Sequence, residues 1–169
     1  VYWFALSNDG VYYLWRELYG YGDKENTGTR EDATVVADKI KRIEIHDQRL
    51  GYEYRMNLAD PSIFSKIGAE RSIGQIFRDK GVKWTEAYNA PRSRVNGAQE
   101  IIRLLAEGRL KVFSTCKHWL RTIPQLPPDS LNPEDVDTDA EDHAWDATRY
   151  GVMKARRMPE IDSIHGSRG

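Results

Sequence analysis

Segments with strand character alternate with segments with helix character along the chain of 169 residues. The first feature is a hairpin, because Asp9-Gly10 between two apolar and aromatic runs is a strong turn signal. Later segments follow helical or strand-like apolar spacing and end at Gly or Pro. The predicted strands are 1–6, 11–19, 52–59, 82–88 and 110–114, and the predicted helices are 31–49, 72–80, 94–107, 116–123 and 139–158. This order predicts an α/β fold in which helices flank a mixed sheet.

Composition narrows the class of protein. The net charge is −1, so any contact with nucleic acid has to come from a local basic patch. Cys116 is the only cysteine, which excludes an internal disulfide and fits a reducing compartment. No apolar run is long enough for a membrane span, and 1–6 lacks the basic leader of a signal peptide. We expect one domain over 1–169 with a tail at 159–169, cut from a longer protein because it begins within a strand.

The segment 139–150 is the most unusual part of the sequence. It places four acidic residues and His143 in the first two turns of the predicted helix. Thr138 and Glu141 have the spacing of a capping box, and Asp139, His143 and Asp146 would then share one helix face. Crowded carboxylates repel one another unless a cation offsets the charge, which indicates a divalent metal ion. An acid-rich first turn also suits the helix dipole without metal, but His143 and Asp146 lie further in.

Asp60 lies at the carboxyl end of a predicted strand, the edge at which open α/β sheets bind ligands. Asp60-Pro61 is also ordinary turn chemistry, and this alternative stays open. If Asp60 meets Asp146 and His143 at this edge, the three can hold Mg²⁺ or Mn²⁺ in a two-metal site. Glu17, on the strand after the hairpin, and Asp142 are possible outer acids. Strict alternation along 11–19 places Glu17 on the same face as Tyr13 and Trp15.

Basic residues form a second group of candidates. Arg92, Arg94, Lys117 and Arg121 surround a predicted helix start and the helix that follows. Such side chains bind the phosphates of a duplex without reading its sequence. A solvated helix face explains the same spacing, so this set alone does not decide the function.

Taken together, these stretches resemble the C-terminal nuclease domain of large terminase subunits, the DNA-packaging motors of tailed bacteriophages. The matching segments are 16–19, 58–62, 72–77 with Gly81, 87–89, 94–97, 113–116 and 142–150. The motifs at 58–62 and 142–150 are the specific ones. The resemblance covers nearly the whole chain.

The resemblance implies an RNase H-like fold, with a central mixed sheet and helices on both faces. It implies a metal-dependent endonuclease that cuts concatemeric double-stranded DNA in the cytoplasm of the host bacterium, encoded by a phage or prophage. Asp60 and Asp146 are then the metal-binding and catalytic carboxylates, with His143 beside them. The implied partners are DNA, the portal protein and the small terminase subunit, and no membrane is involved.

One part of the family pattern has no counterpart here. The family's first catalytic aspartate lies on a strand before the hairpin, and no residue from Val1 onward matches it. The ATPase domain is absent as well, because no Gly-x-x-x-x-Gly-Lys-Ser/Thr motif occurs, so ATP would act only through that domain. These departures leave a second hypothesis open, a catalytically incomplete module that binds DNA or the portal.

Overall fold

The structure is a computed structural model that describes residues 1–22, 27–66, 71–130 and 132–155. The predicted tail at 159–169 lies outside the described residues. In chain order the elements are β1 (Tyr2–Leu6), β2 (Tyr12–Glu17), α1 (Ala33–Arg49), β3 (Leu58–Ala59), the short 3-10 helix η1 (Pro61–Phe64), α2 (Ile73–Asp79), β4 (Thr85–Glu86), α3 (Ser93–Ala106), β5 (Leu110–Val112), α4 (Lys117–Thr122), η2 (Ile123–Gln125) and α5 (His143–Ala155).

The described strands form two small sheets instead of one central sheet. β1 pairs antiparallel with β2, and β2 pairs parallel with β5, which gives a mixed three-stranded sheet. β3 and β4 form a separate parallel pair. The prediction of a mixed α/β fold is confirmed, but the predicted strands 52–59 and 82–88 are wrong in length. Thr85 and Glu86 are both exposed, so the alternation that would extend a half-buried strand is missing there.

A β-bulge in the hairpin changes which side chains face the core. Trp3 lies opposite Arg16 and Phe4 lies opposite Leu14, so Trp15 has no partner in the ladder. The extra residue reverses the alternation beyond it. As a result Glu17 lies on the α4 side together with the buried Leu14, and the predicted grouping of Glu17 with Tyr13 and Trp15 is wrong.

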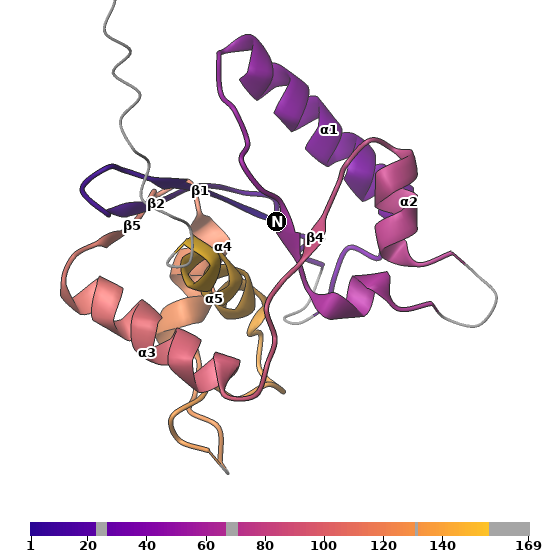
Figure 1. The fold of residues 1–169 in the computed structure, drawn as a ribbon. Helices are drawn as coiled ribbons and strands as arrows, with labels where there is room; N and C mark the ends of the chain where they lie inside the picture. The colour runs from indigo at the N-terminus through magenta and orange to yellow at the C-terminus, as the bar shows by residue number, and fades with distance from the viewer. Residues whose placement is uncertain (23–26, 67–70, 131, 156–169) are drawn as a thin grey trace, which may run out of the picture.

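Two hydrophobic clusters hold the molecule together. The larger one joins β2 and β5 to α3, α4 and α5 around Leu14, Ile101, Leu104 and Trp145. The smaller one packs α1 against α2 and the residues around β4, with Val1 and Leu18 from the hairpin at its border. Figure 1 shows these groups as separate parts of the ribbon, with α3, α4 and α5 together on one side and α1 and α2 on the other.

Local sequence signals explain most helix ends. Asp32 caps α1 by accepting a hydrogen bond from the Thr34 backbone N–H, and Ser72 with Gln75 forms a capping box at α2. α3 differs, because Arg92 stands at its N-cap with a left-handed backbone and no side-chain cap is described there. Among the described residues, no helix combines the length and the apolar character needed to cross a membrane.

Candidate functional site

Helix α5 begins later in the acidic segment than the sequence predicts. α5 begins at His143, and residues 138–142 form turns before it, with the Asp146 N–H donating to the Asp142 carbonyl. Thr138 and Glu141 therefore form no capping box. The Glu141 carboxylate accepts hydrogen bonds from Arg121 at 2.7 and 2.9 Å and from the Tyr19 hydroxyl instead. Asp139 precedes the helix, so its predicted place on one helix face with His143 is wrong.

Asp146 lies in the first turn of α5 and is held by two arginines. Nη1 of Arg94, from α3, donates to both of its oxygens at 3.1 and 3.3 Å. Nε of Arg149, one turn along α5, donates to Oδ1 at 3.0 Å. The carboxylate is thus turned toward the contact between α3 and α5.

Asp60 directly follows β3, as predicted, and caps the short helix η1. Its Oδ1 accepts a hydrogen bond from the Ser62 N–H at 2.8 Å, and its Oδ2 accepts one from the Tyr150 hydroxyl. Burial raises the pKa of this carboxyl, but the hydrogen bonds from Ser62 and Tyr150 outweigh burial and hold the pKa below its ordinary value. Asp60 is therefore a carboxylate at neutral pH.

Neighbouring side chains of α5 connect Asp60 to Asp146. Tyr150 binds Asp60, Arg149 binds Asp146, and the Arg149 guanidinium lies 4.4 Å from the centre of the Tyr150 ring. The two acids, far apart in the sequence, thus contact neighbouring side chains of α5.

Arg94 gathers three acids around one guanidinium. Its Nε lies 2.7 Å from Asp135, its Nη1 3.1 Å from Asp146 and its Nη2 3.5 Å from Asp142. Burial and the negative charge of Asp146 raise the pKa of the Asp142 carboxyl, and Arg94 opposes this only in part. Negative charge therefore remains in excess around Arg94.

Of the other two predicted acid-site candidates, His143 lies at the edge of this cluster beside Asp142, and Glu17 lies apart from it. The His143 side chain is 69% exposed, and its Nδ1 is 3.8 Å from the nearest oxygen of Asp142. Glu17 accepts hydrogen bonds from the backbone N–H groups of His118 at 2.8 Å and Trp119 at 3.1 Å, and so caps α4. Glu17 thus has a structural role in this arrangement.

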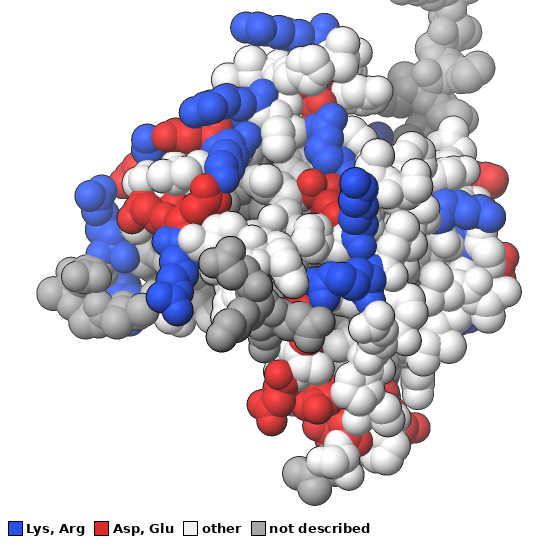
Figure 2. Space-filling model, turned by 180° about the vertical axis from the view of Figure 1, so that it is seen from behind, with Lys and Arg blue, Asp and Glu red and all other residues white. Residues whose placement is uncertain are grey.

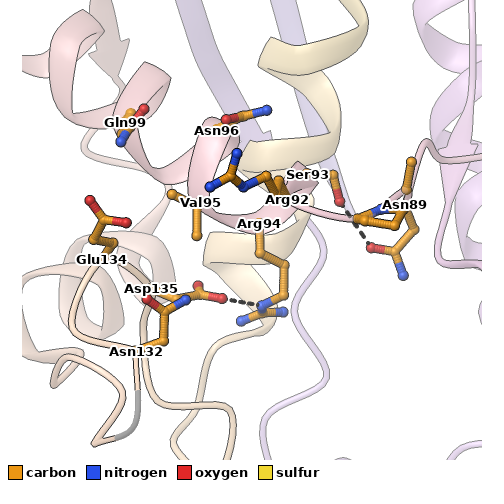
Figure 3. A pocket seen from close by; sticks show the side chains of 12 residues that line it. Asn89, Arg92, Ser93, Arg94, Val95, Asn96, Gln99, Asn132, Glu134 and Asp135 are labelled. Carbon is orange, nitrogen blue, oxygen red and sulfur yellow. Dashed lines mark hydrogen bonds and ion pairs between the residues drawn. The ribbon is translucent and has the colours of Figure 1, made fainter.

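The predicted DNA-binding residues divide between two places. Arg92 and Arg94 line a cavity of about 900 Å³ at the N-terminus of α3, where Asn96, Gln99 and the loop carrying Asn132 and Asp135 form the other walls. In Figure 3 the Arg94 side chain leaves α3 toward Asp135 on that loop. Lys117 is exposed at the start of α4, whereas Arg121 is paired with Glu141.

Figure 2 shows a face of mixed charge, on which Lys and Arg side chains lie next to Asp and Glu side chains and acidic side chains gather at the lower end. This mixture agrees with the net charge of −1.

Three residues of the site were not among the predicted site residues. Asp135 lies between the predicted helices 116–123 and 139–158, where no element was predicted, and it forms an ion pair with Arg94. Arg149 and Tyr150 belong to the motif at 142–150, and the spacing Asp146–Arg149 was a usable signal for a helical ion pair. Gly97 makes the contact possible, because a Cβ at this position would lie 2.3 Å from Cγ of Arg149.

The acids do not fit a divalent metal ion as they are arranged. No group of three or more His, Cys, Asp or Glu side chains that could hold an ion is present within the described parts of the chain. Both oxygens of Asp60 and both oxygens of Asp146 are engaged by protein donors. The oxygen donors themselves are of the kind that Mg²⁺ and Mn²⁺ bind.

Comparison with known proteins defines the fold. No protein-family model and no curated protein matches the sequence. Among solved structures, the P22 large terminase nuclease domain is similar, with a TM-score of 0.59 and 20% identity over 89% of this chain and 70% of that one. The resemblance predicted from the sequence is thereby confirmed at the level of the fold.

Proposed function

We propose that this chain is the nuclease domain of a phage DNA-packaging terminase and hydrolyses phosphodiester bonds of double-stranded DNA. One observation carries the proposal beyond the shared fold. A carboxylate at the end of β3, Asp60, and a carboxylate in α5, Asp146, are brought to adjacent side chains of one helix. The terminase motifs at 58–62 and 142–150 imply that these two carboxylates belong to one site, which supports the proposal.

The same proposal covers the reaction, the substrate and the partners. The reaction is a two-metal hydrolysis with Mg²⁺ or Mn²⁺ that cuts concatemeric DNA, with His143 beside the metal site. The domain works with a portal and a small terminase subunit in the bacterial cytoplasm. The site also needs the aspartate that the family places on a preceding strand. Oxygen-rich sites of this kind lower the barrier to phosphodiester hydrolysis by stabilising the attacking and leaving oxygens.

The proposal is tested by cleavage of supercoiled plasmid with Mg²⁺ or Mn²⁺, using the longest native form of the protein. Asp60→Asn and Asp146→Asn should each abolish cutting while leaving the fold intact. Asp38→Asn is the matched control, because Asp38 is an acid on α1 that pairs with Lys80 away from the site. Undiminished cutting by both site variants would reject the assignment.

A second candidate is a binding module that has the fold but does not cut. The engagement of Asp60 and Asp146 by Tyr150, Arg94 and Arg149 favours it, because these contacts occupy the oxygens that a metal would need. DNA binding that weakens steeply with salt, without metal binding and without cleavage, would select this candidate. Metal-dependent cleavage that requires Asp146 would exclude it.

A further inference from the structure

We propose that the outer face of α3 reads the base edges of a DNA duplex next to the candidate site, through Arg92, Asn96 and Gln99. The inference rests on the proposed nuclease function and adds a sequence preference to it. The three side chains determine specificity in this scheme and take no part in the chemical step. Their partner is the base pairs, in contrast to the phosphates that a nuclease can bind on any sequence.

The first argument is the kind of side chain on this face. Asn96 and Gln99 are exposed and three residues apart on α3, so they share one face, and Arg92 stands at the N-cap before them. The carboxamides of Asn and Gln pair with adenine through a donor and an acceptor, and Arg donates two hydrogen bonds to guanine. A phosphate only accepts hydrogen bonds, so it would leave the acceptor half of each carboxamide unused.

The second argument is that these side chains are free to bind. Arg92, Asn96 and Gln99 make no side-chain hydrogen bond and no ion pair within the described parts of the chain. Further along α3, Arg103 is held by two glutamates from α3 and its C-terminal end, at 2.8 and 2.6 Å. The first half of the outer face is therefore available to a ligand, whereas the second half is engaged in its own ion pairs.

The third argument is the wall opposite α3. All three side chains line the cavity of about 900 Å³, and Figure 3 shows Glu134 on the loop across from α3. A carboxylate at this place repels a phosphate, but it accepts a hydrogen bond from the amino group of cytosine. A cavity whose walls carry a cation, carboxamides and a carboxylate therefore suits base edges, which offer both donors and acceptors, better than a sugar–phosphate backbone.

The fourth argument is the position of this face relative to the candidate site. Arg94, between Arg92 and Asn96 in the sequence, donates to Asp146 at 3.1 Å, so the start of α3 adjoins both the acids and the cavity. Three residues of a helix span about 4.5 Å, close to the ~3.4 Å between base pairs, so Asn96 and Gln99 would meet neighbouring pairs. A duplex bound at Asp146 would therefore pass its next base pairs along α3.

The test measures base preference in binding, without cutting. The longest native form of the protein is mixed with duplexes of randomised sequence in EDTA, and the bound duplexes are separated by gel electrophoresis and sequenced. We expect the wild type to enrich purines at neighbouring positions of one strand.

Two variants of α3 assign the preference to single side chains. Asn96→Ala and Gln99→Ala should each lower the preference at one position roughly tenfold. Their binding to unselected duplexes should change by less than about threefold, because no charge is lost. Gln48→Ala removes an exposed carboxamide of α1 and, as the matched control, should retain the wild-type preference.

Two further variants separate base reading from phosphate binding. Arg92→Gly removes the guanidinium at a position whose φ of 65° suits glycine, and should abolish a guanine preference and weaken binding to every sequence. Glu134→Gln should change the preference at a cytosine position. Thermal unfolding of each variant verifies that it is folded.

The outcomes that overturn the inference are distinguishable from failure of the nuclease proposal. Binding without a base preference, or a preference that survives in all three α3 variants, rejects base reading and leaves the nuclease proposal standing. If Glu134→Gln strengthens binding to all sequences equally and changes no preference, the cavity holds phosphate and base reading is wrong. A preference that follows these residues in a protein that cuts no plasmid supports base reading and rejects the nuclease, and no binding to any duplex rejects both.

Discussion

Two arginine–aspartate contacts join distant parts of this molecule, and they are built differently. Arg16 of β2 binds Asp47 of α1, which also accepts a hydrogen bond from Tyr54. Arg94 of α3 binds three acids from α5 and the loop before it. The first contact matches one cation with one anion, and the second does not.

The difference lies in the balance of charge and in the burial of the carboxylates. The Asp47 carboxylate is enclosed at 0% exposed and carries one cation, Arg16, whose side chain is 28% exposed and whose guanidinium lies 4.2 Å from the centre of the Trp15 ring. The Arg94 cluster holds excess negative charge, part of it on Asp142, whose pKa is raised by burial and by Asp146. A carboxyl group with a perturbed pKa beside a cavity marks a candidate functional site.

Breaking the Arg16–Asp47 pair should have the largest effect on the stability of the protein. Arg16→Met leaves the Asp47 carboxylate buried without its cation, and we expect a loss of about 3 kcal/mol in the free energy of unfolding. Urea unfolding measures it. Lys39→Met, at an exposed pair with Glu31, is the control and should change stability by less than about 0.5 kcal/mol. Equal losses in the two variants would contradict the enclosed position of the Asp47 carboxylate.

The packing of Arg149, which binds Asp146, depends on the absence of a side chain at Gly97. Gly97→Ala places a Cβ where Arg149 Cγ now packs, at 2.3 Å, and we expect a destabilisation of roughly 1–3 kcal/mol. Gly28→Ala is the control, since the nearest atom to its added Cβ lies at 3.8 Å. The melting temperature of each variant measures the effect. Unchanged stability in Gly97→Ala would show that α3 and α5 can separate without loss.

The two contacts should respond oppositely to acid. The pKa of Asp47 is lowered, because hydrogen bonds from Arg16 and Tyr54 outweigh its burial, so its contribution to stability is present at neutral pH and lost as pH falls through the folded pKa. The pKa of Asp142 is raised, so its ionisation costs stability at neutral pH, and this cost disappears as pH falls through that raised pKa.

Unfolding from neutral to acidic pH measures the difference in two variants. Asp47→Asn should be less stable than the wild type at neutral pH, and the gap should close in acid. Asp142→Asn should be more stable at neutral pH, and its advantage should vanish in acid. The same sign in both variants would mean that the two contacts are electrostatically alike.

His143 should have the smallest effect on stability. Its exposed side chain contributes little to packing, so His143→Ala should change the free energy of unfolding by less than about 0.5 kcal/mol. If His143 takes part in the reaction as proposed, cleavage should fall by about a hundredfold in the same variant. Full cleavage would remove His143 from the site, and a large loss of stability would contradict its place on the surface.

Sequence patterns predicted the elements better than their arrangement. The hairpin turn and the position of Asp60 after a strand follow from local chemistry and are confirmed. The bulge at Trp15 is set by pairing between strands, so alternation alone misplaced Glu17. Helix α5 begins late because Arg121 and Tyr19, distant in sequence, bind Glu141.

Sequence motifs pointed to the acids Asp60 and Asp146 but not to the arginines that bind Asp146. The motifs pointed to Asp60 and Asp146, and the structure brings both to α5. Arg94 was predicted to bind DNA from its charge, but only the packing of α3 on α5 shows that it faces three carboxylates. Asp135 lies in a proline-rich segment that has no periodic pattern, so the sequence did not indicate its contact with Arg94. Contacts of this kind depend on tertiary packing, which local spacing does not encode.

Asp60 and Asp146 are proposed to act together as oxygen ligands in a DNA-cutting site. Electron paramagnetic resonance of Mn²⁺, titrated into the longest native form of the protein with a short duplex present, measures whether they do. We expect bound Mn²⁺ in the wild type and a loss of affinity of at least about tenfold in both Asp60→Asn and Asp146→Asn. Mn²⁺ binding that is equally strong in the wild type and both variants would contradict it.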